Sequence, residues 1–325
     1  MLRSYQYTEK SYFEYTFQSN LFRDKQIEIA RRFVSMHPIR MDMKETCPVC
    51  GQAVGNYFFS KWKVDYVCCP ACKSIFAIYD KQTVEAYRAN PELLELRISD
   101  VYQEEITQNR QDIWNEFLEW IEVRAFRFMG RNRNLSIVDY GNRFEGYIDS
   151  IRKSPICGSY ALKSSILSVD VDDIQYGKAD MVLYLDQMQQ EMQPAACIQE
   201  LKKYLKEDGI LILNTRAGSG FDIVTLKEKN ARIYPYEHIL LPSVKGLVSF
   251  LEKNGFEILE ITTPGVMDVK YVLDFKDKLD DQENFVKYLL EESSQSMLQE
   301  FQRFLQKGCL SSFVSLIARK DKIEI

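Results

Sequence analysis

"VDYGNRFEGY", residues 138–147, stands between an apolar run and an amphipathic stretch, and this segment decides the fold. The preceding "LSIV" is typical of a short buried strand, and a helix is expected to follow the turn. Nucleotide-binding domains place glycines in this first turn so that the main chain can approach the ligand. Asp139 and Gly141 suit such a turn, whereas Arg143 and Glu145 stand where further glycines are usual.

Strands alternate with helices downstream of this turn. The clearest helix is "PSVKGLVSFLEKNGF", in which Ser243 can cap the start and Gly255 can end the helix in a left-handed conformation. A helical insertion is predicted from about 275 to 308. Such alternation predicts a mostly parallel α/β sheet that is covered on both faces. Further strands are predicted at 179–185, 209–213, 256–261 and 312–319.

The composition indicates an ordinary globular protein with more than one folded unit. The chain has 325 residues, of which 46% are hydrophobic and 27% charged. A net charge of −5 argues against a dominant nucleic-acid role, and the basic stretch 127–133 is better interpreted as a solvated helix end than as an RNA contact. No apolar run reaches membrane-spanning length, and "MLRSYQYTEK" does not have the pattern of a signal peptide. We therefore expect a cytoplasmic protein with no nucleic-acid partner and no membrane span.

Four of the eight cysteines form two Cys-x-x-Cys pairs, Cys47 with Cys50 and Cys69 with Cys72. Two such pairs can bring four thiolates to one tetrahedral Zn²⁺ and leave no coordination position open, which predicts a structural zinc ribbon. A redox pair or a site without metal is the alternative. Cys68 could replace Cys69 as a ligand, but the spacing favours Cys69.

These patterns divide the chain into four predicted segments. They are an aromatic and helical extension (1–43), a zinc ribbon (44–80), a helical linker (81–133) and a Rossmann-like domain (134–325).

The chain resembles class I S-adenosylmethionine-dependent methyltransferases that carry an N-terminal Cys-x-x-Cys zinc domain, many of which act on sugars or other small metabolites. The resemblance covers nearly the whole chain and has least support before residue 44. It implies a Rossmann-like, mostly parallel sheet with the last strand antiparallel between the fifth and the sixth. The stretches that carry it are "CPVCG" with "CPACK", "IVDYGNRFEGY", "ADMVLYLDQMQQ", "LKKYLKEDGILILNTRAGSGFDIVTL" and "IYPYEHILLPSVKGLVSFLEKNGFEILEITTPGVMDV".

The resemblance also implies S-adenosylmethionine as the cofactor. The family has glycines at the positions of Arg143 and Glu145, and "GSYALKSS" offers no acid for the ribose at the end of the second strand. The segment between Asp139 and Asp180 is too short for the two strands and crossover helices that the family places there, so at least one helix is expected to be missing. The implied cofactor-binding residues are Asp139, Gly141, Asn142, Arg143, Asp170 and Asp186.

The segment "YPYEH" holds the candidate catalytic residues Glu237 and His238. A histidine of near-neutral pKa can act as a base, although packing of a loop against the sheet is the alternative role. The loop "NTRAGSGFDI" is a candidate lid, and Arg216, Phe221 and Tyr236 are predicted to contact the substrate. The predicted function is methyl transfer to a small-molecule or sugar-type acceptor. The alternative is a catalytically inactive relative that binds a protein partner.

Overall fold

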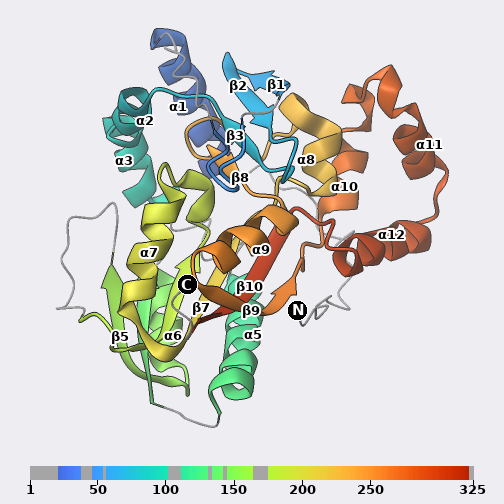
Figure 1. Ribbon diagram of the computed structural model, residues 1–325. Coiled ribbons are helices and arrows are strands. Elements are labelled where there is room, and N and C mark those ends of the chain that lie inside the picture. Colours follow the sequence, from blue (N-terminus) through green and yellow to red (C-terminus); the bar gives the residue numbers. More distant parts are fainter. Residues whose placement is uncertain are drawn as a thin grey trace.

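The computed structural model describes residues 21–37, 46–53, 56–101, 111–130, 134–141, 145–163 and 175–321. A six-stranded sheet with helices on both faces forms the larger part, and a four-stranded sheet lies at its upper end in Figure 1.

The six strands of the large sheet run in the order β5-β4-β6-β7-β10-β9. β4, β5, β6 and β7 pair in parallel, while β10 pairs antiparallel with both β7 and β9. The predicted fold, mostly parallel with an antiparallel last strand between its neighbours, is therefore confirmed. The strands are β4 (Leu135–Tyr140), β5 (Cys157–Lys163), β6 (Ala179–Leu185), β7 (Leu205–Arg216), β9 (Phe256–Thr262) and β10 (Phe313–Lys320).

Apolar side chains on both faces of the strands explain why helices cover the sheet on both sides. On one face, Trp120 and Ile121 of α5 (Gln111–Met129) and Ile151 of α6 (Glu145–Lys153) share a core with β4, β6 and β7. On the other face, α7 (Pro194–Tyr204) and α9 (Val244–Lys253) pack on the opposite side chains of the same strands. Within the described residues, one strand and one helix lie between β4 and β6.

The predicted helical insertion is present and packs against the loop after β7. Its helices share a core with α8 (Phe221–Leu226) and lie at the right in Figure 1. They are α10 (Asp268–Asp274), α11 (Asn284–Glu292) and α12 (Gln295–Lys307). The described residues also include the short 3₁₀ helices η3 (Met188–Gln190), η4 (Lys227–Lys229), η5 (Lys276–Lys278) and η6 (Asp281–Glu283).

The small sheet is fully antiparallel and joins two distant parts of the chain. β8 (Leu240–Leu241), which directly precedes α9, adds to the edge of β3 (Ile75–Ala77). β1 (Asn56–Lys61) and β2 (Val64–Cys68) complete the order β1-β2-β3-β8. α1 (Leu21–Met36), α2 (Lys81–Arg88) and α3 (Pro91–Ile98) share an apolar, aromatic-rich core with this sheet.

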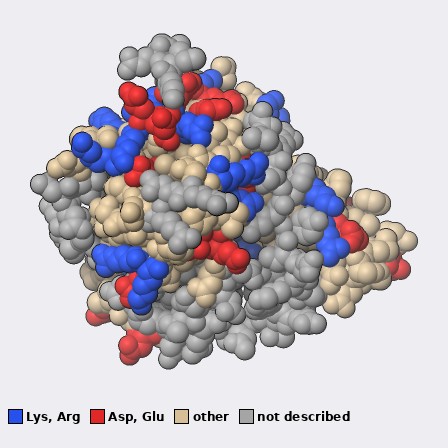
Figure 2. Space-filling model, turned by 90° about the horizontal axis from the view of Figure 1, so that it is seen from below, with Lys and Arg blue, Asp and Glu red and all other residues tan. Residues whose placement is uncertain are grey.

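Among the described residues, no helix combines the length and the apolar composition that crossing a bilayer requires. Figure 2 shows that Lys and Arg side chains are interspersed with Asp and Glu side chains on the face seen from below.

Candidate functional site

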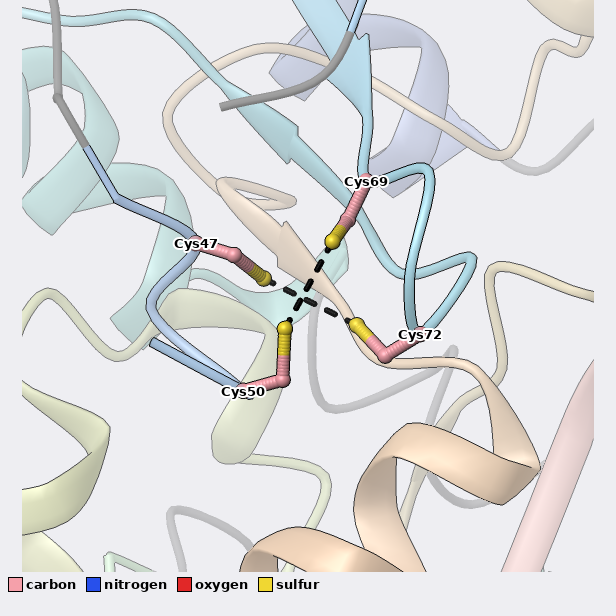
Figure 3. A group of neighbouring side chains, drawn as sticks. All are labelled: Cys47, Cys50, Cys69 and Cys72. Atoms are coloured by element: carbon pink, nitrogen blue, oxygen red, sulfur yellow. Dashed lines mark hydrogen bonds between the residues drawn. The ribbon is translucent and has the colours of Figure 1, made fainter. Parts of the chain in front are cut away.

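The sulfur atoms of the two Cys-x-x-Cys pairs converge on one point (Figure 3). The Sγ atoms of Cys47 and Cys72 lie 3.7 Å apart, those of Cys50 and Cys69 lie 3.5 Å apart, and all four lie within 4.8 Å of one another. Four sulfurs around a tetrahedral Zn²⁺, each at about 2.3 Å from the metal, are separated by about 3.8 Å. The residues therefore fit a bound metal ion.

Each pair sits in a tight turn that a residue with positive φ closes. Gly51 (φ 76°) donates its N–H to the carbonyl of Cys47, and Lys73 (φ 62°) donates to that of Cys69, both at 2.9 Å. The hydrogen bond with Cys47 lowers the pKa of Cys72 to about 4, which favours a thiolate at this position. Cys68 lies outside the group, so the geometry agrees with the choice of Cys69 from the spacing.

The second cysteine pair is attached directly to the α/β part of the chain. Ser243 caps α9 through a hydrogen bond from the N–H of Gly246 (2.8 Å), as predicted, and its hydroxyl donates to the carbonyl of Cys72. The N–H of Ser243 donates to Ser74 Oγ at 3.0 Å. A Cβ atom at Gly246 would lie 2.5 Å from Ser74 Oγ, so only glycine allows this close approach.

Asp139 and Gly141 lie at the carboxyl end of β4, where parallel sheets bind their ligands. The carboxylate of Asp139 is fully buried and accepts a hydrogen bond from the hydroxyl of Tyr160 at 2.7 Å. Burial and the Asp139 carboxylate raise the pKa of Tyr160, so the phenol keeps its proton. Gly141 has φ 90°, and a Cβ atom there would lie 2.8 Å from Cγ of Gln187.

Asp186 follows β6 directly and adopts φ 54°, a conformation that is uncommon for a residue with a side chain. Its N–H donates to Oδ1 of Asn214 at 2.7 Å, and its Oδ1 atom accepts from Nε2 of Gln189 at 2.5 Å. Because Gln187 faces Gly141, the ends of β4 and β6 meet here. The structure thus brings together three of the predicted cofactor-binding residues, while the other three, Asn142, Arg143 and Asp170, lie outside the described residues.

Sequence reasoning missed three side chains at this edge, namely Tyr160, Lys163 and Gln187. Lys163 ends β5, where the resemblance placed an acid, and it donates a hydrogen bond to the hydroxyl of Tyr204. Lys163 lies beside the glycine turn, since the N–H of Gly141 donates to the carbonyl of Lys163 at 2.7 Å. For Tyr160 and Gln187, no sequence pattern indicated the partner.

The structure places Glu237 and Tyr236 away from any open surface. Glu237 forms a buried ion pair with Arg97 of α3 at 2.7 Å. Tyr236 is 1% exposed, and its ring packs 5.3 Å from that of Tyr87 and 5.9 Å from that of Phe33. Direct contact between Tyr236 and a substrate is therefore not supported, because the large aromatic ring fills the core around the small sheet.

His238 is buried, and its ring geometry argues against a role as a base. Its Nδ1 atom accepts a hydrogen bond from the N–H of Tyr234 at 3.3 Å, so the neutral ring carries its proton on Nε2 and presents a donor there. Burial, together with the charge of Arg216, lowers the pKa of His238 well below 6.5. The side chain is thus neutral and suited to donate a hydrogen bond.

The loop after β7 is packed against neighbouring segments in this structure. The N–H of Gly218 donates to the carbonyl of Pro242 at 2.9 Å, and Gly220 lies so close to Ser312 that a Cβ atom would clash. The glycines allow this close packing. Phe221 packs with its ring 5.1 Å from that of Phe301 in α12.

No family model matches the sequence, and neither does any curated protein. Among solved structures, a phosphoethanolamine N-methyltransferase 2 from Haemonchus contortus, bound to phosphomonomethylethanolamine and S-adenosylhomocysteine, is similar at 14% identity. The match covers 76% of this chain and 62% of that chain, with a TM-score of 0.46. The [4+2]-cyclase SpnF is similar at 14% identity over 62% of this chain and 80% of its own, with a TM-score of 0.35.

A Bacillus halodurans protein whose assignment as a methyltransferase is provisional matches at 15% identity over 64% of this chain and all of its own (100%), with a TM-score of 0.39. At these identities the likeness concerns the fold alone. The strand order and the antiparallel β10 agree with the sheet arrangement expected from the sequence.

Proposed function

We propose that the protein is an S-adenosylmethionine-dependent methyltransferase that acts on a small-molecule or sugar-type acceptor. The observation that carries this proposal is the edge formed by Asp139, Gly141 and Asp186. There a buried carboxylate, a glycine with positive φ and a second carboxylate lie at the carboxyl ends of β4 and β6. Ligands of open α/β sheets bind at such an edge.

S-adenosylmethionine, when bound, supplies an electrophilic methyl group, and the chain contributes mainly positioning and exclusion of water. Tyr160 fixes one oxygen of Asp139, and Gln189 fixes one oxygen of Asp186. Both carboxylates are thereby oriented before any ligand arrives. Glu237 is engaged by Arg97, so we assign it a structural role, and His238 can donate a hydrogen bond from Nε2 to an acceptor oxygen.

We further propose that Cys47, Cys50, Cys69 and Cys72 hold one structural Zn²⁺. Four thiolates complete a tetrahedral shell, so such an ion has no open position for catalysis. Its role would be to hold the small sheet and the start of α9 in place.

Calorimetric titration of the zinc-replete protein with S-adenosylmethionine and S-adenosylhomocysteine tests the proposed function. We expect micromolar binding that is lost in Asp139→Ala. Asp180→Ala is the matched control, because Asp180 is the second residue of β6, at the opposite edge of the sheet, where it forms an ion pair with Lys206 at 2.7 Å. Absence of binding at millimolar concentrations, in protein whose circular dichroism shows it to be folded, would refute the proposal.

The position of Lys163 favours a second candidate function, that of a methyltransferase-like protein that serves as a binding module without catalysis. A lysine ends β5, where an acid for the ribose is expected, and its side chain is committed to Tyr204 and Glu200. In that case neither S-adenosylmethionine nor S-adenosylhomocysteine binds, and co-purification would identify a protein partner.

A further inference from the structure

The helical insertion presents a group of large apolar side chains to solvent. Phe285 and Tyr288, on successive turns of α11, are 74% and 63% exposed, and Met297 and Phe304 of α12 are each 59% exposed. Within the described ranges, Phe285 and Phe304 are the only phenylalanines that lie so open to solvent. Single exposed apolar residues are ordinary, but a group of them on one part of a protein indicates an interaction surface.

Both helices bury their opposite faces against α10. Leu290 of α11 and Leu298 and Leu305 of α12 share a core with Val269 and Val272 of α10. The exposed side chains therefore point away from α10, to the outer side of the insertion, which forms the right margin of the molecule in Figure 1. They add little to the packing of this core.

The exposed face of α12 is a single stripe of two apolar and two charged side chains. Its members follow one another at intervals of three and four residues, which places them along one side of the helix. They are Met297, Glu300, Phe304 and Lys307. Glu300 lies in the first half of α12, and Lys307, the last residue of the helix, lies two turns later.

The order of the two charges along this stripe is self-complementary. When two copies of α12 lie antiparallel about a two-fold axis beside Phe304, Glu300 of one copy is opposite Lys307 of the partner subunit. The two Phe304 rings then meet at the centre of the contact. A parallel arrangement would instead place like charges side by side. Glu300 also pairs with Arg303 of its own helix, but an exposed pair of this kind contributes little and leaves Glu300 able to turn to a partner.

The exposed apolar area is sufficient for a dimer. At the fractions given above, the four apolar side chains of α11 and α12 leave about 500 Å² open to water. Burial of this surface on two copies removes about 1,000 Å² from water, which reaches the lower limit for a specific protein interface. Aromatic residues and methionine are also enriched in such interfaces.

We propose that the outer side of the insertion is the interface of a symmetric homodimer, in which the α12 helices of two copies pair in antiparallel orientation. The proposal does not depend on the proposed function. The ring of Phe301 lies 6.4 Å from that of Phe304 and 5.1 Å from that of Phe221 in α8. The interface would therefore contact, through Phe301, the helix that follows the loop after β7.

Sedimentation equilibrium of the full-length, zinc-replete protein tests the proposal. We expect the wild type to have twice the chain mass of 38.1 kDa at micromolar concentrations. Glu300→Lys and Lys307→Glu should each raise the dissociation constant of the dimer at least about tenfold, because each places two pairs of like charges opposite one another. The double variant Glu300→Lys, Lys307→Glu restores the opposite charges and should dimerise as the wild type does.

Two controls separate this contact from general surface effects. Glu85→Lys makes the same charge change on the exposed side of α2 and should leave the dimer unchanged. Phe304→Ser should give a monomer, whereas Ile98→Ser, at a 76% exposed position of α3, should not. Circular dichroism of every variant shows that it is folded.

Three outcomes would overturn the proposal. They are a monomeric wild type, a dimer that Glu300→Lys does not weaken, and a double variant that stays as weak as the single ones. Sedimentation with vesicles of phosphatidylcholine and phosphatidylserine completes the test. A monomeric wild type that binds these vesicles, and loses binding in Phe304→Ser, would assign the exposed side chains to a membrane surface.

Discussion

The hydroxyl of Ser243 donates a hydrogen bond to the carbonyl of Cys72, which joins the first turn of α9 to the second cysteine pair. One side chain therefore serves as a helix cap and as a link between the two sheets. Since β3 and β8 also pair across this boundary, the cysteine group is part of the α/β core and not an appended module.

Replacement of Ser243 by alanine should lower the free energy of unfolding by about 2–3 kcal/mol, because it removes a cap and also leaves a buried carbonyl unsatisfied. Urea denaturation measures this loss. Ser294 caps the exposed start of α12 without any contact to the cysteine group, so Ser294→Ala should cost only about 1 kcal/mol. Equal losses in the two variants would show that the bond to Cys72 contributes nothing.

Removal of zinc should destabilise the whole chain in one transition. The cysteine pairs share a core with the helices and strands of the large sheet, so the two parts should not melt separately. Metal analysis should find one zinc per chain in the wild type and in Cys68→Ser, but none in Cys72→Ser. Calorimetric scans with and without a chelator measure the transition, and two separate transitions would contradict the prediction.

Removal of one partner from the buried ion pair of Arg97 and Glu237 should lower the free energy of unfolding more than replacement of both partners. Glu237→Ala leaves Arg97 without its partner and should cost about 3–5 kcal/mol, whereas the double variant Arg97→Met, Glu237→Leu should recover much of that loss. Glu300→Ala breaks an exposed pair with Arg303 and should cost less than about 1 kcal/mol. A Glu237→Ala variant that unfolds like the wild type but fails to turn over substrate would restore the catalytic role predicted from the sequence.

His238 should make stability depend on pH. The pKa of His238 in the folded protein is far below 6.5, so the unfolded chain binds a proton first. The contribution of neutral His238 to the free energy of unfolding is complete above about pH 6.5. Below that pH this contribution is lost, at up to about 1.4 kcal/mol per pH unit. Denaturation at pH 7.5 and 5.5 should show this loss in the wild type and in His37→Gln, but not in His238→Gln. An equal loss of stability in His238→Gln would show that other titratable groups cause the pH dependence.

Local sequence patterns predicted the features that lie within a single strand, helix or turn. The apolar run 179–185 is β6 without change, and the cap at Ser243 and the left-handed Gly255 frame α9 as predicted. The four cysteines could be found from spacing alone because each pair folds within a single tight turn.

Pairings between distant residues could not be predicted in this way. Arg97 and Glu237 are 140 positions apart, and no periodicity connects them. Leu240 and Leu241 form too short a strand to have an alternation of their own. The segment "YPYEH" resembled a catalytic loop because it holds a histidine, a carboxylate and tyrosines, yet Tyr236, Glu237 and His238 are buried.

The pairing of β8 with β3 sets an order of events during synthesis. Both cysteine pairs leave the ribosome long before Leu240 and Leu241 exist, so metal can be captured while one edge of β3 is still unpaired. An unpaired strand edge is prone to associate with other chains. Fragments that end before residue 241 should consequently aggregate even when fully loaded with zinc, and the nascent chain must be shielded until most of it has been made.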